Sequence, residues 1–292
     1  MLSLALPKGS LEEQTLRLFE EADLPVRRAS EREYNAVIRD PRIGQVKILR
    51  PQEIPQYVEQ GYFDLGITGL DWVLETRSQV AEVLDLAYSK QGVGDPVKIV
   101  LAVSEASGID KPGDIRPGSR ISTEYLGLTR DYFARLGVPV KVELSYGATE
   151  AKVPEMADAI VDITETGATL RRHGMRIVDV LLESTTKLIA NQQSYADATK
   201  RREIEEIVTL LKGVLDARGK VLVKLNVSEE NLEKVVEVLP AAKSPTVSRL
   251  YGSPYFAVES VVVKSEINLL IPELKRRGAE DILEIPMSKI VA

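Results

Sequence analysis

Cysteine is absent from the 292-residue sequence, and histidine occurs only once, as His173. The lack of cysteine excludes disulfides, thiolate zinc sites, iron–sulfur clusters and a cysteine nucleophile. With one histidine, the chain is a poor match for a histidine-rich metal site or a Ser-His-Asp triad. His173 comes at the end of a short predicted helix, and we expect it to cap that helix rather than to take part in catalysis.

Basic residues and long apolar runs are also in short supply. The chain has 38 Lys and Arg against 44 Asp and Glu, a net charge of −6. A general nucleic-acid-binding protein carries a basic excess, so the composition argues against that class. The longest apolar runs, at 99–103 and at 258–263, which Glu259 interrupts, are far too short for a membrane span. Met1–Lys8 has no basic start or cleavage site of a signal peptide. We therefore expect a cytoplasmic protein with no nucleic-acid or membrane partner.

Strand-length apolar runs alternate with helix-length amphipathic segments through most of the chain before residue 200. The expected strands include Leu2–Leu6, Val46–Leu49, Asp64–Thr68, Val97–Val103, Arg120–Thr123 and Ala157–Ile163. Ser10, followed three residues later by Glu13, predicts a capping box at the start of the first helix. The alternation predicts an α/β protein with mostly parallel sheets, and the loop-rich stretch 103–118 marks the entry to a second α/β lobe.

The C-terminal stretch 213–292 has a different pattern. Strand, helix, strand, strand, helix and strand are expected there in that order, which is the ferredoxin-like βαββαβ motif. We expect Ser228 to cap the first of these helices, and Pro272 to kink the second or to delay its start. The stretch holds 11 basic and 11 acidic residues, so the whole net charge falls on residues 1–212. This difference supports a separate C-terminal module.

The segment Ala157–Leu170 carries the strongest chemical signal. An apolar strand ends in carboxylates, and a loop rich in Thr and Gly leads into a helix. Free N–H groups at a helix start, with threonine hydroxyls beside them, bind phosphate. Asp162 and Glu165 beside that loop suit ribose hydroxyls or a phosphate-bound Mg²⁺. The pattern indicates a sugar-phosphate site, although Thr164 or Thr166 acting only as a helix cap would produce it too.

Other candidate residues follow the ends of expected strands, where open α/β sheets bind ligands. Lys8 would place an ammonium group there, but an ordinary surface lysine has the same signature. Arg50 follows a second strand. Gly66 and Gly69 flank the end of a third, where a ligand's base or phosphates could approach the backbone closely, unless both are simply turn glycines.

Five motifs in this order resemble the ATP phosphoribosyltransferase family, which carries out the first step of histidine biosynthesis. They are Leu6–Ser10 (LPKGS), Leu49–Pro55 (LRPQEIP), Asp64–Asp71 (DLGITGLD), Ala157–Leu170 (ADAIVDITETGATL) and Lys187–Asn191 (KLIAN). Lys243–Ser248 (KSPTVS) and the segment 271–283 resemble the regulatory domain of the family's long form. The resemblance covers essentially the whole chain.

The resemblance implies two periplasmic-binding-protein-like (type II) α/β lobes around a catalytic cleft, and a C-terminal ferredoxin-like βαββαβ domain. On this basis we expect 1–100 plus 185–212 to form one lobe, 101–184 the lobe with the phosphoribosyl pyrophosphate loop, and 213–292 the regulatory domain. The implied reaction transfers phosphoribosyl from 5-phosphoribosyl 1-pyrophosphate to N1 of ATP, with Mg²⁺. Feedback inhibition by L-histidine and assembly into homodimers and homohexamers are implied as well.

The same resemblance implies roles for single residues. Lys8, Asp162 and Glu165 are expected to be catalytic: Lys8 and Mg²⁺ neutralise pyrophosphate, and the two carboxylates hold the ribose hydroxyls. No direct protein ligand of the metal is assigned. The expected substrate-binding positions are Arg50, Gly69, Asp71, Thr164, Thr166, Gly167, Ala168, Thr169 and Leu170. The expected histidine-sensing positions are Asn226, Thr246 and Ala257.

The sequence also departs from the family pattern. Glu53 stands where aspartate is usual, Ser10 where arginine is frequent, and Lys98 takes the place of an arginine that usually follows a cysteine. Asn226 falls where relatives often have a carboxylate. An asparagine in place of that acid would weaken the binding of a cationic ligand. The nucleotide pocket near 90–98 is therefore the least well defined part of the expected site.

Two other functions share parts of this pattern. A two-lobed solute-binding protein has the same kind of fold, but such proteins are normally exported. A phosphoribosyltransferase of the type-I fold has a similar phosphate loop, usually after two adjacent acids, whereas Asp162 is followed by Ile163.

Overall fold

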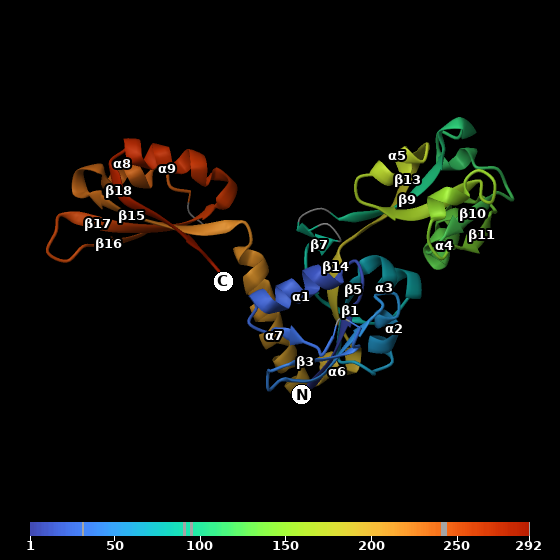
Figure 1. The fold of residues 1–292 in the computed structure, drawn as a ribbon, viewed down its shortest axis with the longest axis horizontal. Coiled ribbons are helices and arrows are strands. Elements are labelled where there is room, and N and C mark those ends of the chain that lie inside the picture. The colour runs from blue at the N-terminus through green and yellow to red at the C-terminus, as the bar shows by residue number, and fades with distance from the viewer. Residues whose placement is uncertain (31, 90–91, 94–95, 241–243, 292) are drawn as a thin grey trace. The chain divides into compact units, whose positions relative to one another are not determined.

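The computed structural model describes residues 1–30, 32–89, 92–93, 96–240 and 244–291. The chain divides into two compact units, Met1–Val208 and Thr209–Ala292 (Figure 1). Within the described residues the first unit contains a seven-stranded sheet, a five-stranded sheet and a two-stranded pair, and the second unit contains a four-stranded sheet. No helix in the described part of the chain is long and apolar enough to cross a membrane.

The first sheet has seven strands in the order β2-β3-β4-β1-β5-β14-β6. Their bounds are Leu2–Pro7 (β1), Val26–Arg27 (β2), Asn35–Ile38 (β3), Ile43–Leu49 (β4), Leu65–Gly69 (β5), Ala81–Asp85 (β6) and Thr186–Ala190 (β14). Helices α1 (Glu12–Glu21), α2 (Ile54–Glu59), α3 (Leu70–Thr76) and α6 (Gln192–Ala196) accompany it. The core is apolar, and Leu4, Leu6, Ile67 and Ile189 are almost completely buried.

The second sheet has five strands in the order β11-β10-β12-β9-β13. Their bounds are Val97–Ser104 (β9), Arg120–Thr123 (β10), Lys141–Leu144 (β11), Ala159–Thr164 (β12) and Met175–Ser184 (β13). Helices α4 (Leu126–Leu136) and α5 (Ala168–Arg172) and the 3-10 turns Glu105–Ser107, Pro112–Asp114 and Thr149–Lys152 belong to this part. The sheet begins at Val97, so β9 runs through residue 100, where the sequence placed the end of the first lobe. Strands β7 (Tyr88–Ser89) and β8 (Gly92–Val93) form a separate small hairpin.

The expectation of mostly parallel sheets is wrong. In the first sheet β1 is parallel to β4 and β5, but the pairs formed by β3, β14 and β6 are antiparallel. In the second sheet β9 is antiparallel to both β12 and β13. The reason is topological, because β9 leads into the second sheet and β13 and β14 lead back from it. The sequence analysis did not identify β13 and β14 as strands.

The second unit confirms the predicted βαββαβ order. Its elements are β15 (Lys220–Ser228), α8 (Leu232–Val236), β16 (Thr246–Arg249), β17 (Tyr255–Val263), α9 (Ile267–Arg276) and β18 (Ala279–Pro286), with strand order β16-β17-β15-β18. Alternate residues of β15, including Val223 and Leu225, are buried in one core with Val235 of α8 and Leu274 of α9. Helix α7 (Ala198–Ala217) contains the boundary between the two units.

Two predicted helix caps are wrong, and one of the two alternatives predicted for Pro272 is excluded. The residue before α1 is Leu11, which has no side-chain cap, and Glu12 rather than Glu13 accepts a hydrogen bond from Gly9 N at 3.2 Å. A 3-10 turn, Glu229–Asn231, follows Ser228, so the Ser228 side chain caps no helix. Pro272 lies inside α9, which begins at Ile267, and this excludes a late start. In the first two cases an extra turn separates the hydroxyl from the helix.

Candidate functional site

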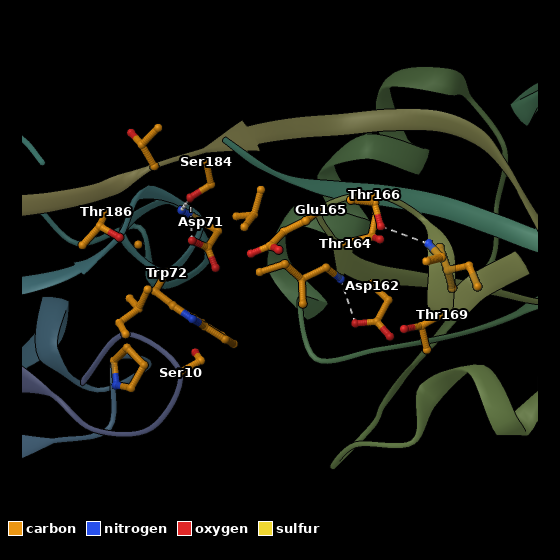
Figure 2. A pocket seen from close by; sticks show the side chains of 18 of the residues that line it. Ser10, Asp71, Trp72, Asp162, Thr164, Glu165, Thr166, Thr169, Ser184 and Thr186 are labelled. Atoms are coloured by element: carbon orange, nitrogen blue, oxygen red, sulfur yellow. Dashed lines mark hydrogen bonds between the residues drawn. The ribbon is translucent and has the colours of Figure 1, made fainter. Parts of the chain in front are cut away.

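A cavity of about 540 Å³ opens in the first unit between residues of its two sheets. Figure 2 shows Asp162, Thr164, Glu165, Thr166 and Thr169 on one side of it, and Asp71, Trp72, Ser184 and Thr186 on the other. Ala168 and Leu170 complete the threonine-rich wall, and Ser10, Leu11 and Pro51 lie at the edge of the first sheet. The cavity therefore collects residues that lie far apart in the sequence, from Ser10 to Thr186.

The threonine-rich loop is held in shape by its own hydroxyls. Thr164 Oγ1 accepts from Gly167 N at 2.9 Å, and Thr166 Oγ1 accepts from Ala168 N at 3.4 Å. Gly167 has a φ of +71°, and a Cβ there would meet Arg171 Nη1 at 2.9 Å. The N-cap residue of α5 is Gly167, which has no side-chain cap, so Thr164 and Thr166 stabilise the loop rather than cap the helix, and both line the cavity. The amides of Thr169 and Leu170 open α5, where first-turn N–H groups have no intrahelical acceptor.

Asp162, on β12, is a carboxylate in an acidic surrounding. Burial raises the pKa of Asp162 to about 6, and the negative charges of Glu150 and Glu124 add to this rise, while the Ile163 N–H bond and Lys152 oppose it. Asp162 Oδ1 accepts from Ile163 N at 2.7 Å. A carboxylate held at a raised pKa gains from a ligand that donates hydrogen bonds or brings positive charge.

Asp71 is buried, with 3% of its surface exposed, and its oxygens are already engaged. Oδ1 accepts from Ser184 Oγ at 2.6 Å, and Oδ2 accepts from the Tyr125 hydroxyl at 2.9 Å. Burial raises the pKa of Asp71, and the bonds to Ser184 and Tyr125 counteract that rise. Its geometry is that of a link between α3 and the second sheet rather than that of an open ligand-binding carboxylate.

The α3–α4 junction extends this link. Glu75 of α3 accepts from the backbone N–H groups of Gly127 and Leu128, at 2.8 and 2.9 Å, at the start of α4. The Trp72 ring stacks on the Tyr125 ring, with centroids 4.7 Å apart and planes at 27°. Arg77 forms an ion pair with Asp131 at 2.8 Å. We use the name α3–α4 junction for these contacts, which hold one side of the cavity.

Lys8 and Arg50 are at the predicted strand ends, after β1 and β4, but they are not among the described residues that line the cavity. Lys8 Nζ instead lies over the Tyr34 ring, 4.5 Å from its centroid. Gly167 also stands outside the lining, although Ala168 belongs to it. Ser10 and Pro51, which are close in sequence to Lys8 and Arg50, do line the cavity, so the two basic side chains begin near its edge.

The two glycines of the segment 64–71 have structural explanations. A Cβ at Gly66 would meet Ile54 Cγ2 at 2.5 Å and Val58 Cγ2 at 2.7 Å, so this glycine allows α2 to pack on β5. The expectation that Gly66 admits a ligand is therefore wrong. Gly69 does line the cavity, and a Cβ there would collide with Asp71 Oδ1 at 2.1 Å. The lack of a side chain at Gly69 therefore leaves the space that the Asp71 carboxylate occupies.

The sequence analysis missed several lining residues. Glu150, Tyr88 and Ser184 come from elements that carried no recognised motif, whereas Trp72 and Thr186 directly adjoin the motifs 64–71 and 187–191. Trp72 had one usable signal, since it is the only tryptophan of the chain and follows the singled-out Asp71 directly. His173 is confirmed as the C-cap of α5, with Nδ1 2.9 Å from Thr169 O. Most of the segment 90–98 expected near the nucleotide has no described side chains, and only 96–98 can be placed fully.

The expected histidine-sensing positions share one sheet face of the second unit. Asn226 on β15 pairs in register with Ala257 on β17, and Thr246 on β16 pairs with Glu259. Because strand side chains alternate, these residues lie on the face opposite the buried core valines. Asn226 Nδ2 donates to Asp281 Oδ2 at 2.9 Å, so β18 supplies a carboxylate beside the asparagine. Lys243 of the KSPTVS motif lies outside the described residues.

Comparison with known proteins gives full-length matches. A family model described as ATP phosphoribosyltransferase matches residues 50–213, and a model of the HisG C-terminal domain matches residues 217–289. The chain is 46% identical over 292 residues to an ATP phosphoribosyltransferase of Desulforudis audaxviator, with 99% of each chain covered. It is 46% identical to that of Chlorobium chlorochromatii, over 100% of this chain and 98% of the relative.

A solved structure extends the match to three dimensions. A chain of the ATP phosphoribosyl transferase (HisG:HisZ) complex from Thermotoga maritima is 27% identical, with a TM-score of 0.64 over 74% of this chain and 99% of that chain. Together these findings define a transferase of the pentosyltransferase class. The chain belongs to the ATP phosphoribosyltransferase family of histidine biosynthesis, in its long form with a C-terminal domain.

Proposed function

We propose that the protein transfers the phosphoribosyl group of 5-phosphoribosyl 1-pyrophosphate to N1 of ATP, giving 1-(5-phosphoribosyl)-ATP and pyrophosphate. The proposal rests on one observation: the threonine-rich loop and Trp72 line the same cavity from opposite sides. The size of the cavity and its mixture of polar and apolar lining suit a sugar phosphate that faces a nucleotide base.

In the proposed reaction, N1 of adenine attacks C1 of the ribose. A bond forms between these atoms, and the bond from C1 to the pyrophosphate oxygen breaks, with its electron pair leaving on pyrophosphate. Adenine N1 is a weak nucleophile and pyrophosphate a good leaving group, so the reaction needs positioning and charge neutralisation more than a strong base. A cavity that holds no histidine among its described lining residues is consistent with this requirement.

The phosphoribosyl end is assigned to the wall formed by β12 and the following loop. We propose that Thr164, Thr166, Gly167, Ala168, Thr169 and Leu170 bind the 5-phosphate through hydroxyls and amides. Asp162 and Glu165 accept hydrogen bonds from the ribose hydroxyls. The raised pKa of Asp162 supports this role, because hydroxyl donors stabilise its charged form.

Lys8 and Arg50 are assigned to pyrophosphate, and Gly69 and Asp71 to the wall that faces ATP. Lys8 would leave the Tyr34 ring and swing toward the cavity edge near Ser10. Among the described residues no group of three or more His, Asp or Glu could hold a metal ion. We propose that Mg²⁺ reaches the site on the substrate phosphates, where it would neutralise the charge of the leaving group.

We further propose the predicted division of labour along the chain. Residues 1–100 plus 185–212 and residues 101–184 form the two catalytic lobes, and residues 213–292 sense L-histidine through Asn226, Thr246 and Ala257. Inhibition from a separate domain requires that histidine bind one global state better than another, such as a hexamer over a dimer. The biosynthetic role supports a cytoplasmic location.

Incubation with ATP, 5-phosphoribosyl 1-pyrophosphate and Mg²⁺ tests the proposal. We expect the product absorbance to rise together with one equivalent of pyrophosphate, and L-histidine to slow both. Omission of either substrate is the control. Binding of a substrate without release of pyrophosphate would leave a binding protein and contradict the proposal.

A further inference from the structure

Trp72 occupies an unusual position in the cavity wall. It is the only tryptophan of the chain, and it lies on α3 directly after Asp71. The structure leaves it partly buried, in contact with the core of the second sheet. Tyr125 covers one side of the indole ring at a centroid distance of 4.7 Å, and other parts of Trp72 line the cavity opposite the threonine-rich loop (Figure 2).

The two walls of the cavity differ in chemistry. One wall offers the hydroxyls of Thr164, Thr166 and Thr169 and the carboxylate of Asp162, all suited to a sugar phosphate. The opposite wall carries the Trp72 indole beside Asp71, Ser184 and Thr186, and the cavity lining also includes the apolar or aromatic side chains of Leu11, Pro51, Tyr88 and Val97. A flat heteroaromatic base gains most on an aromatic surface with apolar neighbours.

We propose that Trp72 is the stacking platform for the adenine ring of ATP, a role that rests on the proposed function. With the ribose on the loop side, adenine must lie across the cavity so that N1 can reach C1. Tyr125 backs the indole, and the Asp71 bonds to Ser184 and Tyr125 fix the start of α3, so the platform is rigid before the nucleotide arrives. A rigid platform loses little conformational entropy on binding.

Because the chain has one tryptophan, its fluorescence reports this position without a variant. We expect ATP to quench the emission of the full-length protein in a saturable way, and 5-phosphoribosyl 1-pyrophosphate alone to leave it nearly unchanged. Saturable ATP binding, measured by calorimetry under the same conditions without quenching, would overturn the stacking.

Kinetics of three variants complete the test. We expect Trp72→Leu to raise the KM for ATP about tenfold, because loss of one stacked base has an effect of that order. The KM for 5-phosphoribosyl 1-pyrophosphate should change less than twofold, and Trp72→Phe should recover most of the ATP affinity. Leu74→Ala on the same helix, at a side chain that is 42% exposed, is the matched control and should resemble the parent protein.

The possible failures can be told apart. If the parent protein forms product but Trp72→Leu raises both KM values equally, the platform role is wrong while the proposed function stands. If the parent protein forms no product, the proposed function itself fails. Should Trp72→Leu not fold, the ratio of the two KM values in Trp72→Phe, together with the fluorescence of the parent protein, decides the matter.

Discussion

Hydroxyl groups are the main polar feature of the wall formed by the loop after β12. Thr166 and Thr169 both line the cavity. We expect Thr166→Val with Thr169→Val to weaken binding of 5-phosphoribosyl 1-pyrophosphate far more than binding of ATP, since each lost bond to a charged group costs about 1.5–3 kcal/mol. Calorimetric titration with each substrate measures the two losses. Equal losses of the two affinities would remove the phosphate assignment.

The Lys8 side chain lies over Tyr34, yet its proposed target is the leaving pyrophosphate. We expect Lys8→Ala to lower turnover strongly while it changes the free energy of unfolding by less than about 0.5 kcal/mol, as is usual for a surface lysine. Steady-state rates at saturating substrates and urea unfolding supply the two measurements. Lys141→Ala, an exposed lysine on the edge strand β11, is the matched control. Unchanged turnover in Lys8→Ala would make Lys8 an ordinary surface residue.

We expect the buried Asp162 carboxylate to lower the free energy of unfolding at neutral pH, while it contributes to binding of the substrate ribose. Its folded pKa of about 6 exceeds its unfolded value near 3.9, so between these values the folded state binds more protons than the unfolded state. The stability contribution of Asp162 therefore falls as pH rises through this window. Lys152 offsets part of the effect, while Glu124 and Glu150 strengthen it.

We accordingly expect Asp162→Asn to stabilise the protein relative to the parent by about 1–2 kcal/mol more at pH 7.5 than at pH 5. Its affinity for 5-phosphoribosyl 1-pyrophosphate should fall, because an amide is a weaker acceptor for ribose hydroxyls. Urea unfolding at the two pH values is the measurement. A stability difference independent of pH would show that the carboxyl titrates normally in the folded protein.

At the scale of elements, the α3–α4 junction decides how one side of the cavity is held. Glu75 caps two amides at the start of α4 and also benefits from the helix dipole. We expect Glu75→Ala to lower the free energy of unfolding by about 1–2 kcal/mol. Arg77→Ala should change it by less than about 0.5 kcal/mol, because the Arg77–Asp131 pair is largely exposed. Equal effects in urea unfolding would show that Glu75 is no helix cap.

Element positions followed from local sequence, whereas sheet pairing did not. Gly137, at a φ of +70°, ends α4 in the left-handed conformation that glycine adopts most easily. The segment 175–184 forms β13, but its pattern of partly exposed residues lacks the clear period of a half-buried strand. Its partner β9 lies more than 70 residues earlier, and only that distant pairing makes it a strand.

For the whole molecule, the division into two compact units allows the proposed histidine sensor to be tested by truncation. We expect a chain ending at Lys212 to lose inhibition by L-histidine and, where it folds, to retain some catalysis. The reason is that Asn226, Thr246 and Ala257 all lie in the second unit. Calorimetry of L-histidine against the full-length and truncated chains tests this. Equal binding to both would place the sensor within the first unit.

Local sequence was enough to predict the α/β character, the ferredoxin-like order of the last unit and the loop at 164–169. Each of these depends on local periodicity or on a short run of residues, and such information is contained in neighbouring positions. The family resemblance came from the same short motifs, so it too was accessible before the structure.

Which distant side chains meet could be known only from the tertiary structure. It placed Glu150 and Asp162 in one cavity, bonded Asp71 to Tyr125, and set Trp72 opposite the threonine-rich loop. It also showed that Gly66 serves the packing of α2. These relations depend on strand order and on how the two sheets of the first unit pack, and both arise from contacts between residues far apart in the sequence. Periodicity along the chain carries no information about such contacts.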